Sequence, residues 1–359
     1  MTAMTEREPN RPMQVLEVQR EGMCEIFATQ PRGGVTQLCS IAADLDRSAG
    51  AGVVSAEYFD PRTPSAGRDG FAGPLLWVLG ETVGGDLGGV HLRAVVGADL
   101  EPVNLDGRLV GTVIHGPHAS ECLLAGIRAD DTSVSAERQA RATFEGIERA
   151  LETVGMDFSH VARTWLFLDD ILAWYREFNG VRTAFFTERG VFDRMVPAST
   201  GIGGANPWGA AMMAGAYAVR PRDPRVTVEA LPSPLQCPAL QYGSSFSRAV
   251  EIGMPDLRRI FVSGTAGIGP DGHTRHIGDV LAQTALTCDV IEAILASRGM
   301  GWEDVTRATA YVRHPEDVGV LEEHRRAVGM PELPVVTAHN VICRDELLFE
   351  LEVDAVQAR

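Results

Sequence analysis

Two segments of the chain, separated by a constant offset of 144 positions, match each other over a whole helix, turn and strand. The first reads FEGIERALETVGMDFSHVARTWLFLDD (144–170) and the second reads CDVIEAILASRGMGWEDVTRATAYVRH (288–314). The offset pairs identical residues on both sides of the turn: Gln139 with Gln283, Ile147 with Ile291, Gly155 with Gly299, Met156 with Met300 and Arg163 with Arg307. Self-similarity at one fixed offset indicates an internal duplication, so we expect two copies of one fold.

The second copy illustrates the expected elements. Residues 279–297 carry apolar side chains at helical spacing, and Gly299 is placed to end that helix as a C′ glycine. Residues 305–313 alternate between two faces as a strand does, and 259–264 and 347–356 are further expected strands. This order predicts an α+β fold, in which each copy is a mixed β-sheet with helices packed on one face.

Charge and composition exclude several classes of protein. The formal net charge of −16 argues against a nucleic-acid partner or an anionic membrane surface. All 32 basic residues are arginine, so a lysine Schiff base and a P-loop lysine are both impossible. No run of about 20 apolar residues is present, and the first residues lack the apolar core of a secretory signal. We therefore expect a cytoplasmic protein that does not span a membrane.

No metal or cofactor is expected. The 6 cysteines are scattered without a CxxC pair, which in the cytosol predicts thiols. His273 and His276 lie in a turn-rich stretch without a partnering acidic cluster, which disfavours a metal site. The glycine runs at 201–204 and 264–269 do not have the GxGxxG pattern that binds a dinucleotide.

Residues 242–356 resemble the Rid (YjgF-like) superfamily. The residues that carry the resemblance are FSRA (246–249), IFVSGTAG (260–267), the GD…AQT run at 278–284 and FELEVDAV (349–356). The first copy is similar in RTWLFLDDILAWYREFNGVRTAFF (163–186). Single-domain Rid imine deaminases carry a P-x-R motif that clamps the substrate carboxylate, whereas here the stretch is Pro334-Val335-Val336. This departure disfavours imine or enamine hydrolysis.

Tandem Rid-like halves in a chain of this length resemble the chorismatases, which split chorismate into pyruvate and a ring acid. More specific marks are YGSSFSRA (242–249), PASTGIGGANPWGA (197–210) and CRDELLFELE (343–352). The resemblance covers about residues 115–356 and predicts an enzyme that acts on a small molecule without a cofactor. We expect a disordered terminus (1–14), an N-terminal Rid-like domain with a β-rich elaboration at 15–115 (15–222), a linker (223–238), and a C-terminal Rid-like domain that carries the active site (239–359).

Glu350 is the candidate general acid. It stands in the middle of the strand LLFELEV, where the pattern alone favours a solvated face shared with Glu352. The resemblance favours an active-site role, because Rid-like sites use a glutamate at this place. Alignment of the two copies sets Met213 opposite Glu350, so only one copy keeps the acid. A carboxylic acid that stays protonated near neutral pH could protonate the enol ether of chorismate and release pyruvate.

The fate of the ring depends on what attacks after protonation. Attack by the neighbouring ring hydroxyl gives an arene oxide that rearomatises to 3-hydroxybenzoate, whereas entry of water gives a dihydroxycyclohexadiene acid. A cysteine seven residues before the acid is characteristic of the 3-hydroxybenzoate-forming chorismatases, and Cys343 lies at this distance from Glu350. As a thiolate, Cys343 could attack the epoxide transiently or steer its opening. The alternative is that Cys343 is an ordinary buried thiol. A non-catalytic Rid-like binding protein is the remaining alternative, which the presence of Glu350 disfavours.

The two carboxylates of chorismate require arginine forks and polar partners. The candidate substrate-binding residues are Arg248, Tyr242, Gln241, Ser245, Thr265, Gly267, Tyr311, Arg313, Arg163 and Tyr217. Rid proteins are commonly trimers with sites at subunit interfaces, and tandem copies could supply such contacts within one chain. The predicted assembly is therefore a monomer or a homotrimer.

Overall fold

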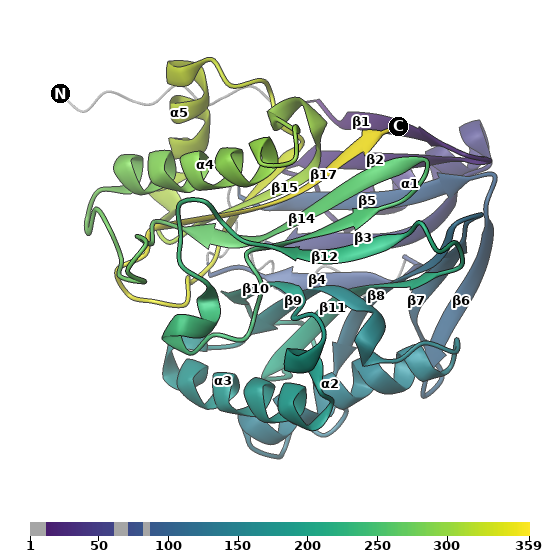
Figure 1. Cartoon of the computed structure of the whole chain (residues 1–359), viewed down its shortest axis with the longest axis horizontal. Helices are drawn as coiled ribbons and strands as arrows, with labels where there is room; N and C mark the ends of the chain where they lie inside the picture. The colour runs from purple at the N-terminus through teal and green to yellow at the C-terminus, as the bar shows by residue number, and fades with distance from the viewer. Residues whose placement is uncertain (1–11, 61–70, 82–86) are drawn as a thin grey trace.

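The computed structural model describes residues 12–60, 71–81 and 87–359. Most of the expected disordered terminus, residues 1–11, lies outside the described residues, and Gln14 already belongs to a strand. The described part of the chain forms three β-sheets, one of five strands and two of six, with helices on their outer sides (Figure 1).

The second and third sheets have the same topology, which confirms the predicted fold. Their strand orders are β6-β7-β8-β11-β9-β10 and β12-β13-β14-β17-β15-β16. In each sheet the strand after the second helix runs parallel to its neighbour, while the last strand is antiparallel to both of its neighbours. The strands of the second sheet are β6 (Asp99–Leu105), β7 (Arg108–His115), β8 (Ala119–Arg128), β9 (Val161–Leu168), β10 (Ala198–Gly203) and β11 (Met212–Pro221). Those of the third are β12 (Thr227–Leu231), β13 (Ala249–Gly253), β14 (Leu257–Ala266), β15 (Val305–Val312), β16 (Val335–His339) and β17 (Phe349–Ala358).

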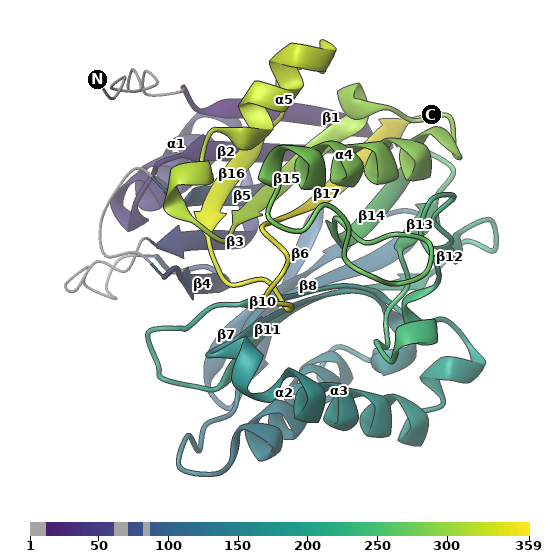
Figure 2. The same cartoon turned by 90° about the vertical axis from the view of Figure 1, so that its left-hand side faces the viewer.

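Two helices cover the outer face of each of these sheets (Figures 1 and 2). They are α2 (Ala136–Glu152) and α3 (Ile171–Glu188) on the second sheet, and α4 (Val280–Ala296) and α5 (Val320–Val328) on the third. The side chains of Ser135 and Asp279 cap α2 and α4 by accepting hydrogen bonds from backbone N–H groups of the first turn. Gly299 adopts φ +67° just after α4, as a C′ glycine does.

The first sheet repeats the same strand order without the first edge strand. Its order β1-β2-β5-β3-β4 corresponds to β7-β8-β11-β9-β10 of the second sheet. Its elements are β1 (Gln14–Arg20), β2 (Met23–Pro31), α1 (Val35–Ala49), β3 (Gly52–Asp60), β4 (Leu75–Leu79) and β5 (Gly89–Val96). The segment expected to be an elaboration thus splits: residues 14–96 build a sheet of their own, and β6 and β7 complete the second sheet. Strand β12 lies within the segment expected to be a linker.

The inner faces of all three sheets meet in one shared core. Three aromatic side chains at matching positions, Phe59, Phe167 and Tyr311, pack there, with ring centroids 6.0 Å apart for Phe59 and Phe167 and 6.1 Å for Phe59 and Tyr311. Separate apolar clusters fill the space between each sheet and its helices. Strand alternation therefore divides each strand between the central core and a helix layer.

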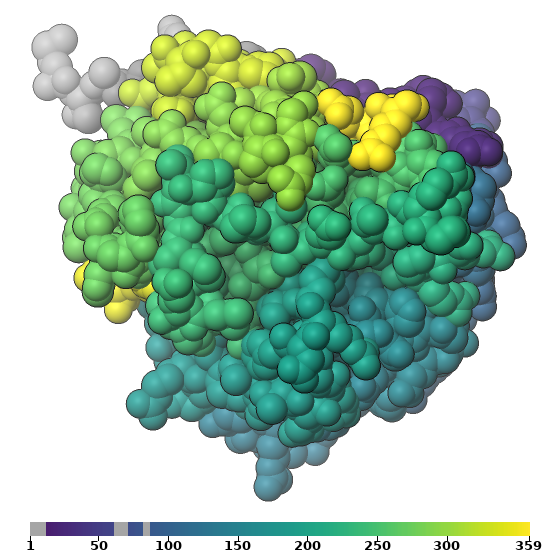
Figure 3. Space-filling model, in the orientation of Figure 1, coloured from purple at the N-terminus to yellow at the C-terminus, as the bar shows by residue number. Residues whose placement is uncertain are grey.

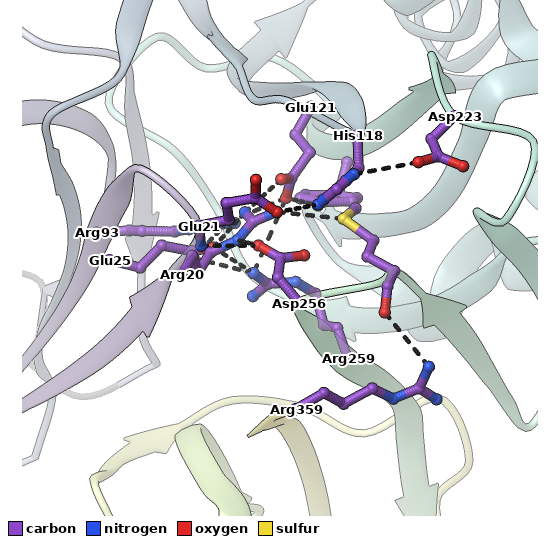
Figure 4. Close-up of polar contacts among 12 residues, drawn as sticks. Arg20, Glu21, Glu25, Arg93, His118, Glu121, Asp223, Asp256, Arg259 and Arg359 are labelled. Atoms are coloured by element: carbon purple, nitrogen blue, oxygen red, sulfur yellow. Dashed lines mark hydrogen bonds and ion pairs between the residues drawn. The ribbon is translucent and has the colours of Figure 1, made fainter.

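A buried ionic cluster joins the three sheets where their inner faces meet (Figure 4). Glu25, Glu121 and Arg259 occupy matching positions, since each pairs with a valine of its sheet's last strand. Arg259 Nη2 lies 2.8 Å from Glu25 Oε1, and Arg20 Nη1 lies 2.6 Å from the same oxygen. Arg20 Nη1 also contacts Glu121 of the second sheet. Buried charges of this kind require close partners, and here Arg20–Glu121 and Arg259–Glu25 join different sheets.

Candidate active site

A cavity of about 820 Å³ opens at the junction of the second and third sheets. Its volume is within the range of about 300–1,000 Å³ that is usual for small-molecule sites. We call the second sheet with α2 and α3 the second unit, and the third sheet with α4 and α5 the third unit. In the space-filling view the teal second unit packs directly against the green third unit (Figure 3). The lining residues come from α3, β10, the segment before β13, the end of β14 and the loop before β17: Tyr175, Arg176, Asn179, Gly180, Arg182, Thr183, Ala184, Ser199, Gly201, Tyr242, Gly243, Ser244, Phe246, Arg248, Gly264, Ala266, Ile268, Cys343, Arg344, Leu347 and Glu350.

Backbone contacts fix the two walls of this cavity to each other. The Ser199 N–H of β10 donates to Ser263 Oγ of β14 at 2.8 Å. The Gly203 N–H donates to the Val341 carbonyl at 2.8 Å, and Asn340 Nδ2 returns a hydrogen bond to the Gly203 carbonyl. Figure 2 shows the yellow loop before β17 reaching down to β10. The second unit therefore forms one side of a site whose other side is the third unit.

Glu350 faces this cavity from the middle of the third sheet. It pairs with Ala266 of β14 and Tyr311 of β15, and its side chain is buried, with 4% exposure of the residue. Among the described residues, none forms a hydrogen bond with its carboxyl group. Burial, and next the negative charge of Glu352, raise its pKa to about 8, although Arg163 and Arg248 oppose the shift. Glu350 is therefore a protonated carboxylic acid at neutral pH.

Glu352 lies two residues further along the same strand face and, unlike Glu350, is ionised. Its oxygens accept from Arg163 Nη2 at 2.6 Å and from Arg307 Nη2 at 2.7 Å. Burial opposes ionisation, but the two guanidinium groups outweigh it and hold the pKa of Glu352 below its usual value. Two carboxyl groups on one strand face thus differ in protonation because only one of them has cationic partners at hydrogen-bond distance.

A glycine makes room for the acid. A Cβ atom placed on Gly264 would lie 2.0 Å from Glu350 Oε1 and 3.0 Å from Thr200 Cγ2. The Gly264 N–H donates to Thr200 Oγ1 at 3.0 Å, so the backbone of β14 is held at this close approach. Gly264 of the SGTAG segment is therefore explained by the space that the Glu350 carboxyl occupies.

Three buried or partly buried arginines line the same cavity as the acid. Arg182 Nη2 donates to Asn179 Oδ1 at 2.6 Å, while its buried Nε has no hydrogen-bond partner among the described residues. Arg248 donates from Nε and Nη2 to the Cys237 carbonyl, and its guanidinium carbon lies 5.3 Å from the Tyr242 ring centroid. The guanidinium carbon of Arg344 lies 5.2 Å from the same centroid, and Arg344 donates to the Gly272 carbonyl. These fixed cations suit an anionic ligand.

Cys343 lines the cavity together with Tyr175. Burial, and next the charge of Glu350, raise the pKa of its thiol to about 12, against the lowering effects of Arg344 and of a hydrogen bond with Tyr175. Cys343 is therefore a neutral thiol near neutral pH, not a resident thiolate.

The duplicated glutamine positions the loop that precedes the acid. Gln283 donates to the Glu346 carbonyl and accepts from the Leu348 N–H at 2.8 Å, immediately before β17. Its counterpart Gln139 accepts from the Ala211 N–H at 2.8 Å, immediately before β11. The two copies thus use the same side chain to set the start of the last strand.

Comparisons with known proteins give the family. The model described as chorismatase FkbO/Hyg5-like, N-terminal, matches residues 111–213, and that described as endoribonuclease L-PSP matches residues 239–357. A protein from Streptomyces rapamycinicus named chorismatase is 33% identical over 59% of this chain and 68% of its own length. The chain belongs to the chorismatase family. A Streptomyces hygroscopicus protein named 3-hydroxybenzoate synthase is 31% identical over 59% of this chain and 67% of its own length.

Structural comparison agrees on the fold. A crystal structure of a chorismatase superposes with a TM-score of 0.67, covering 84% of this chain and 92% of its own, at 22% identity. The sequence relatives confirm the predicted family and enzyme class, and this superposition confirms the fold. Among the described residues, no helix is long and apolar enough to cross a membrane, and no group of three or more His, Cys, Asp or Glu side chains could hold a metal ion.

The structure brings together four of the residues predicted for the site of this chorismatase-family chain. Glu350, Cys343, Arg248 and Tyr242 all line the cavity. Gln241 is exposed beside it, and Ser245 is buried behind it, where its hydroxyl contacts Thr183 Oγ1 at 2.9 Å.

The other six predicted residues do not line the cavity, either because of strand alternation or because their side chains make other contacts. Thr265 lies between the lining residues Gly264 and Ala266, so alternation turns its side chain to the opposite face. Gly267 packs against Gln283. The remaining four are committed to other contacts: Arg163 and Tyr311 to Glu352, Arg313 to Asp345 and the Arg344 carbonyl, and Tyr217 to Glu121 in the central cluster.

The sequence did not lead us to the α3 side chains that line the cavity. Tyr175, Asn179 and Arg182 lie at helical spacing within the segment 163–186 that carries the resemblance. That spacing was a usable signal for one shared helix face. Only the docking of α3 against the third unit, however, turns this face into part of the cavity.

Proposed function

We propose that this chain cleaves chorismate to pyruvate and 3-hydroxybenzoate, with Glu350 as the general acid. One observation carries the proposal: Glu350, with a pKa of about 8, is the single carboxyl group among the described lining residues, and the other charged lining residues are arginines. A neutral acid that faces fixed cations suits a dianionic substrate that must be protonated on carbon.

The acid step uses the proton of Glu350. Transfer of this proton to the methylene carbon of the enol ether leaves an oxocarbenium ion and a Glu350 carboxylate. In the lyase route the neighbouring ring hydroxyl attacks the ring carbon that bears the ether oxygen. The C–O bond breaks, and its electron pair forms the keto group of pyruvate. The attacking hydroxyl loses its proton as the arene oxide forms. Opening of the arene oxide and loss of the proton from the ring carbon that bore the ether then give 3-hydroxybenzoate. Of the two protons released, one ends on the phenol oxygen and the other restores the acid form of Glu350. No water is consumed.

The arginines are proposed to bind the two carboxylates of the substrate. Arg182 supports this role because its buried Nε lacks a partner among the described residues, and a carboxylate oxygen would satisfy it. Arg248 and Arg344 flank Tyr242, which places a cationic and aromatic wall beside the acid. A ring between these groups would be held in a fixed orientation toward Glu350.

Cys343 is proposed to steer the second half of the reaction. Its raised thiol pKa, about 12, disfavours attack by a pre-formed thiolate. The neutral thiol instead excludes water from the ring and, through its hydrogen bond with Tyr175, limits the direction in which the epoxide opens. The relative named 3-hydroxybenzoate synthase supports this product.

We also propose that the site is formed by two domains of one chain. The C-terminal domain (239–359) carries the acid, and the preceding domain, which the segment 223–238 joins to it, contributes α3 and β10. Because both walls come from one chain, a monomer suffices for activity. Size-exclusion chromatography coupled to an activity assay tests this, and activity confined to a trimer would contradict it.

The decisive experiment is a product assay. Purified protein is incubated with chorismate, and pyruvate and ring products are quantified by chromatography. Equal amounts of pyruvate and 3-hydroxybenzoate are expected. A dihydroxycyclohexadiene acid in place of 3-hydroxybenzoate would make the protein a chorismate hydrolase. Absence of pyruvate release, together with turnover of an imine substrate, would instead favour the Rid-type deaminase alternative.

A further inference from the structure

We propose that Glu352 and Glu57 are positioning residues for the acid, because they form a chain of ionic contacts that crosses all three sheets and keeps a negative charge beside Glu350. The inference deepens the proposed function and rests on it, since it concerns how Glu350 is kept ready to deliver a proton. Neither residue lines the cavity, so neither is expected to touch the substrate.

Glu352 is the inner end of this chain. Its Oε2 accepts from Arg163 of the second sheet at 2.6 Å and also from the Thr200 hydroxyl. Its Oε1 accepts from Arg307 at 2.7 Å and from the Tyr311 hydroxyl at 3.2 Å. Four donors around a side chain with no solvent exposure fix this carboxylate as an anion.

Arg163 and Arg307 are the pair matched by the internal duplication, and their equivalence explains this arrangement. Each lies at the same place in the strand after the first helix of its unit. The two strands belong to different sheets, and each of the duplicated arginines pairs with a different oxygen of the Glu352 carboxylate. The first copy therefore contributes to the site through the buried cation Arg163, although its own last strand carries Met213 in place of the acid.

Thr200 connects this clamp to the acid. Its hydroxyl accepts from Arg163 Nη2 at 2.5 Å and from the Gly264 N–H at 3.0 Å, and it donates to Glu352 Oε2. These three bonds use the full capacity of a hydroxyl group. Gly264 is the residue that makes room for the Glu350 carboxyl, so a displaced Glu352 would disturb the acid as well.

Glu57 is the outer end of the chain, in β3 of the first sheet. Arg307 Nε donates to Glu57 Oε2 at 3.1 Å, and Arg307 Nη2 contacts the same oxygen. Arg307 Nη1 lies 3.6 Å from Asp354 Oδ2. Burial raises the pKa of Glu57 to about 7, so Glu57 is mostly ionised at the pH at which Glu350 titrates. Its charge then offsets that of Arg307, which also pairs with Glu352, so that Arg307 adds less net positive charge beside the Glu352 carboxylate.

The charges around Glu350 are otherwise positive or neutral. The titratable groups that act on it or share its cavity are Glu352 on β17, Arg163 on β9, Tyr311 on β15, Tyr242 and Arg248 before β13, Tyr175, Arg182 and the exposed Arg176 on α3, and Cys343 and Arg344 before β17. The tyrosines and the thiol are neutral near pH 7, because burial raises their pKa values. Removal of Glu352 would leave two arginines that favour the ionised form of Glu350.

The test compares Glu352→Gln and Glu57→Gln with wild type in two measurements. The first is kcat for chorismate cleavage as a function of pH. The second is the titration of Glu350, followed by NMR with glutamate labelled at the carboxyl carbon and assigned with Glu350→Gln. We expect both variants to lose activity at a lower pH than wild type, by about 1–2 pH units for Glu352→Gln and less for Glu57→Gln. Activity should recover at acidic pH, where Glu350 is protonated again.

Two further variants serve as controls. Glu352→Asp retains the charge and should keep the wild-type basic limb, whereas the exposed Glu332→Gln should change nothing. An equal loss of activity at every pH, without a shifted limb, would show that Glu352 is merely structural and would overturn the proposal. If Glu352→Gln does not fold, the partly buried Glu57→Gln decides, and an unshifted Glu350 titration in it also overturns the proposal. If Glu350→Gln remains active, the proposed function fails, while the NMR titration still reports on this inference separately.

Discussion

Glu350 and Met213 occupy the same position in the last strands of two sheets with one topology. Glu350 pairs with Tyr311, and Met213 pairs with Phe167, the residue that matches Tyr311 in the other copy. Met213 is fully buried in the central core, whereas Glu350 faces the cavity. The duplication thus built two equivalent strands, of which one became the site.

Replacement of the acid should abolish the chemistry without unfolding the chain. Glu350→Gln is expected to lower kcat by about 10²–10⁴-fold, because the neutral amide cannot donate a proton to carbon. The matched control is Met213→Leu, a swap of similar volume that should cost less than about 1.5 kcal/mol of stability and leave turnover unchanged. Pyruvate release, measured for both variants, checks the prediction, and a Glu350→Gln variant with near wild-type turnover would contradict it.

Activity should fall with rising pH. The reaction needs the protonated form of Glu350, so kcat/KM is expected to decline as the pH rises through about 8. A pH–rate profile from about pH 5 to about pH 10 measures this limb on both sides of that value. A profile that stays flat well above the pKa of Glu350 would show that another group supplies the proton.

Stability should depend on pH through the same carboxyl group. The folded-state pKa of Glu350 lies above its ordinary value of 4.5, so the wild type loses stability as the pH rises from about 4.5 to about 8. Glu350→Gln removes this loss, and its Tm relative to wild type should therefore increase with pH over that range. Thermal unfolding at about pH 5 and about pH 8.5 tests the sign, and a constant difference would contradict it.

The close approach at Gly264 predicts a second way to impair the acid. Gly264→Ala would place a methyl group 2.0 Å from Glu350 Oε1, so the carboxyl group must move. We expect at least a roughly tenfold loss of kcat, in line with the cost of a misplaced reacting group. Gly319→Ala is the control, because a Cβ there meets no atom within 4 Å. Equal activity of both variants would argue against a carboxyl group packed this closely on the β14 backbone.

Arg182 and Arg176 line the same cavity but differ in burial, which allows a matched comparison. Arg182→Met should raise KM for chorismate by about 10–100-fold, the value of a lost charge-assisted hydrogen bond. Arg176→Met should change KM little, because the Arg176 side chain is 95% exposed at the rim. Steady-state kinetics on both variants gives the comparison, and an equal effect would remove Arg182 from the substrate site.

Truncation of the cysteine should change the product more than the rate. Cys343→Ala keeps Glu350 and is expected to release pyruvate normally, with less 3-hydroxybenzoate and with 4-hydroxybenzoate or a dihydroxycyclohexadiene acid in its place. The reason is that a smaller side chain admits water and relaxes the direction of epoxide opening. Chromatographic identification of the ring products is the measurement. An unchanged product would assign Cys343 to packing alone.

The sequence by itself determined the repeated unit and the residues within each strand that could carry chemistry. The fixed offset, the capping residues and the alternation in β15 and β17 are local patterns, and the duplicated arginines follow from them, whereas Glu350 and Cys343 were singled out by the resemblance to the Rid proteins and the chorismatases. Only the tertiary structure decided which of these residues meet. Arg163 was expected at the substrate but binds Glu352, and the α3 wall was missed, because the contacts that define both join units far apart in the chain. A buried charge is stabilised by whichever partner the packing brings within hydrogen-bond distance, and no local pattern records that partner.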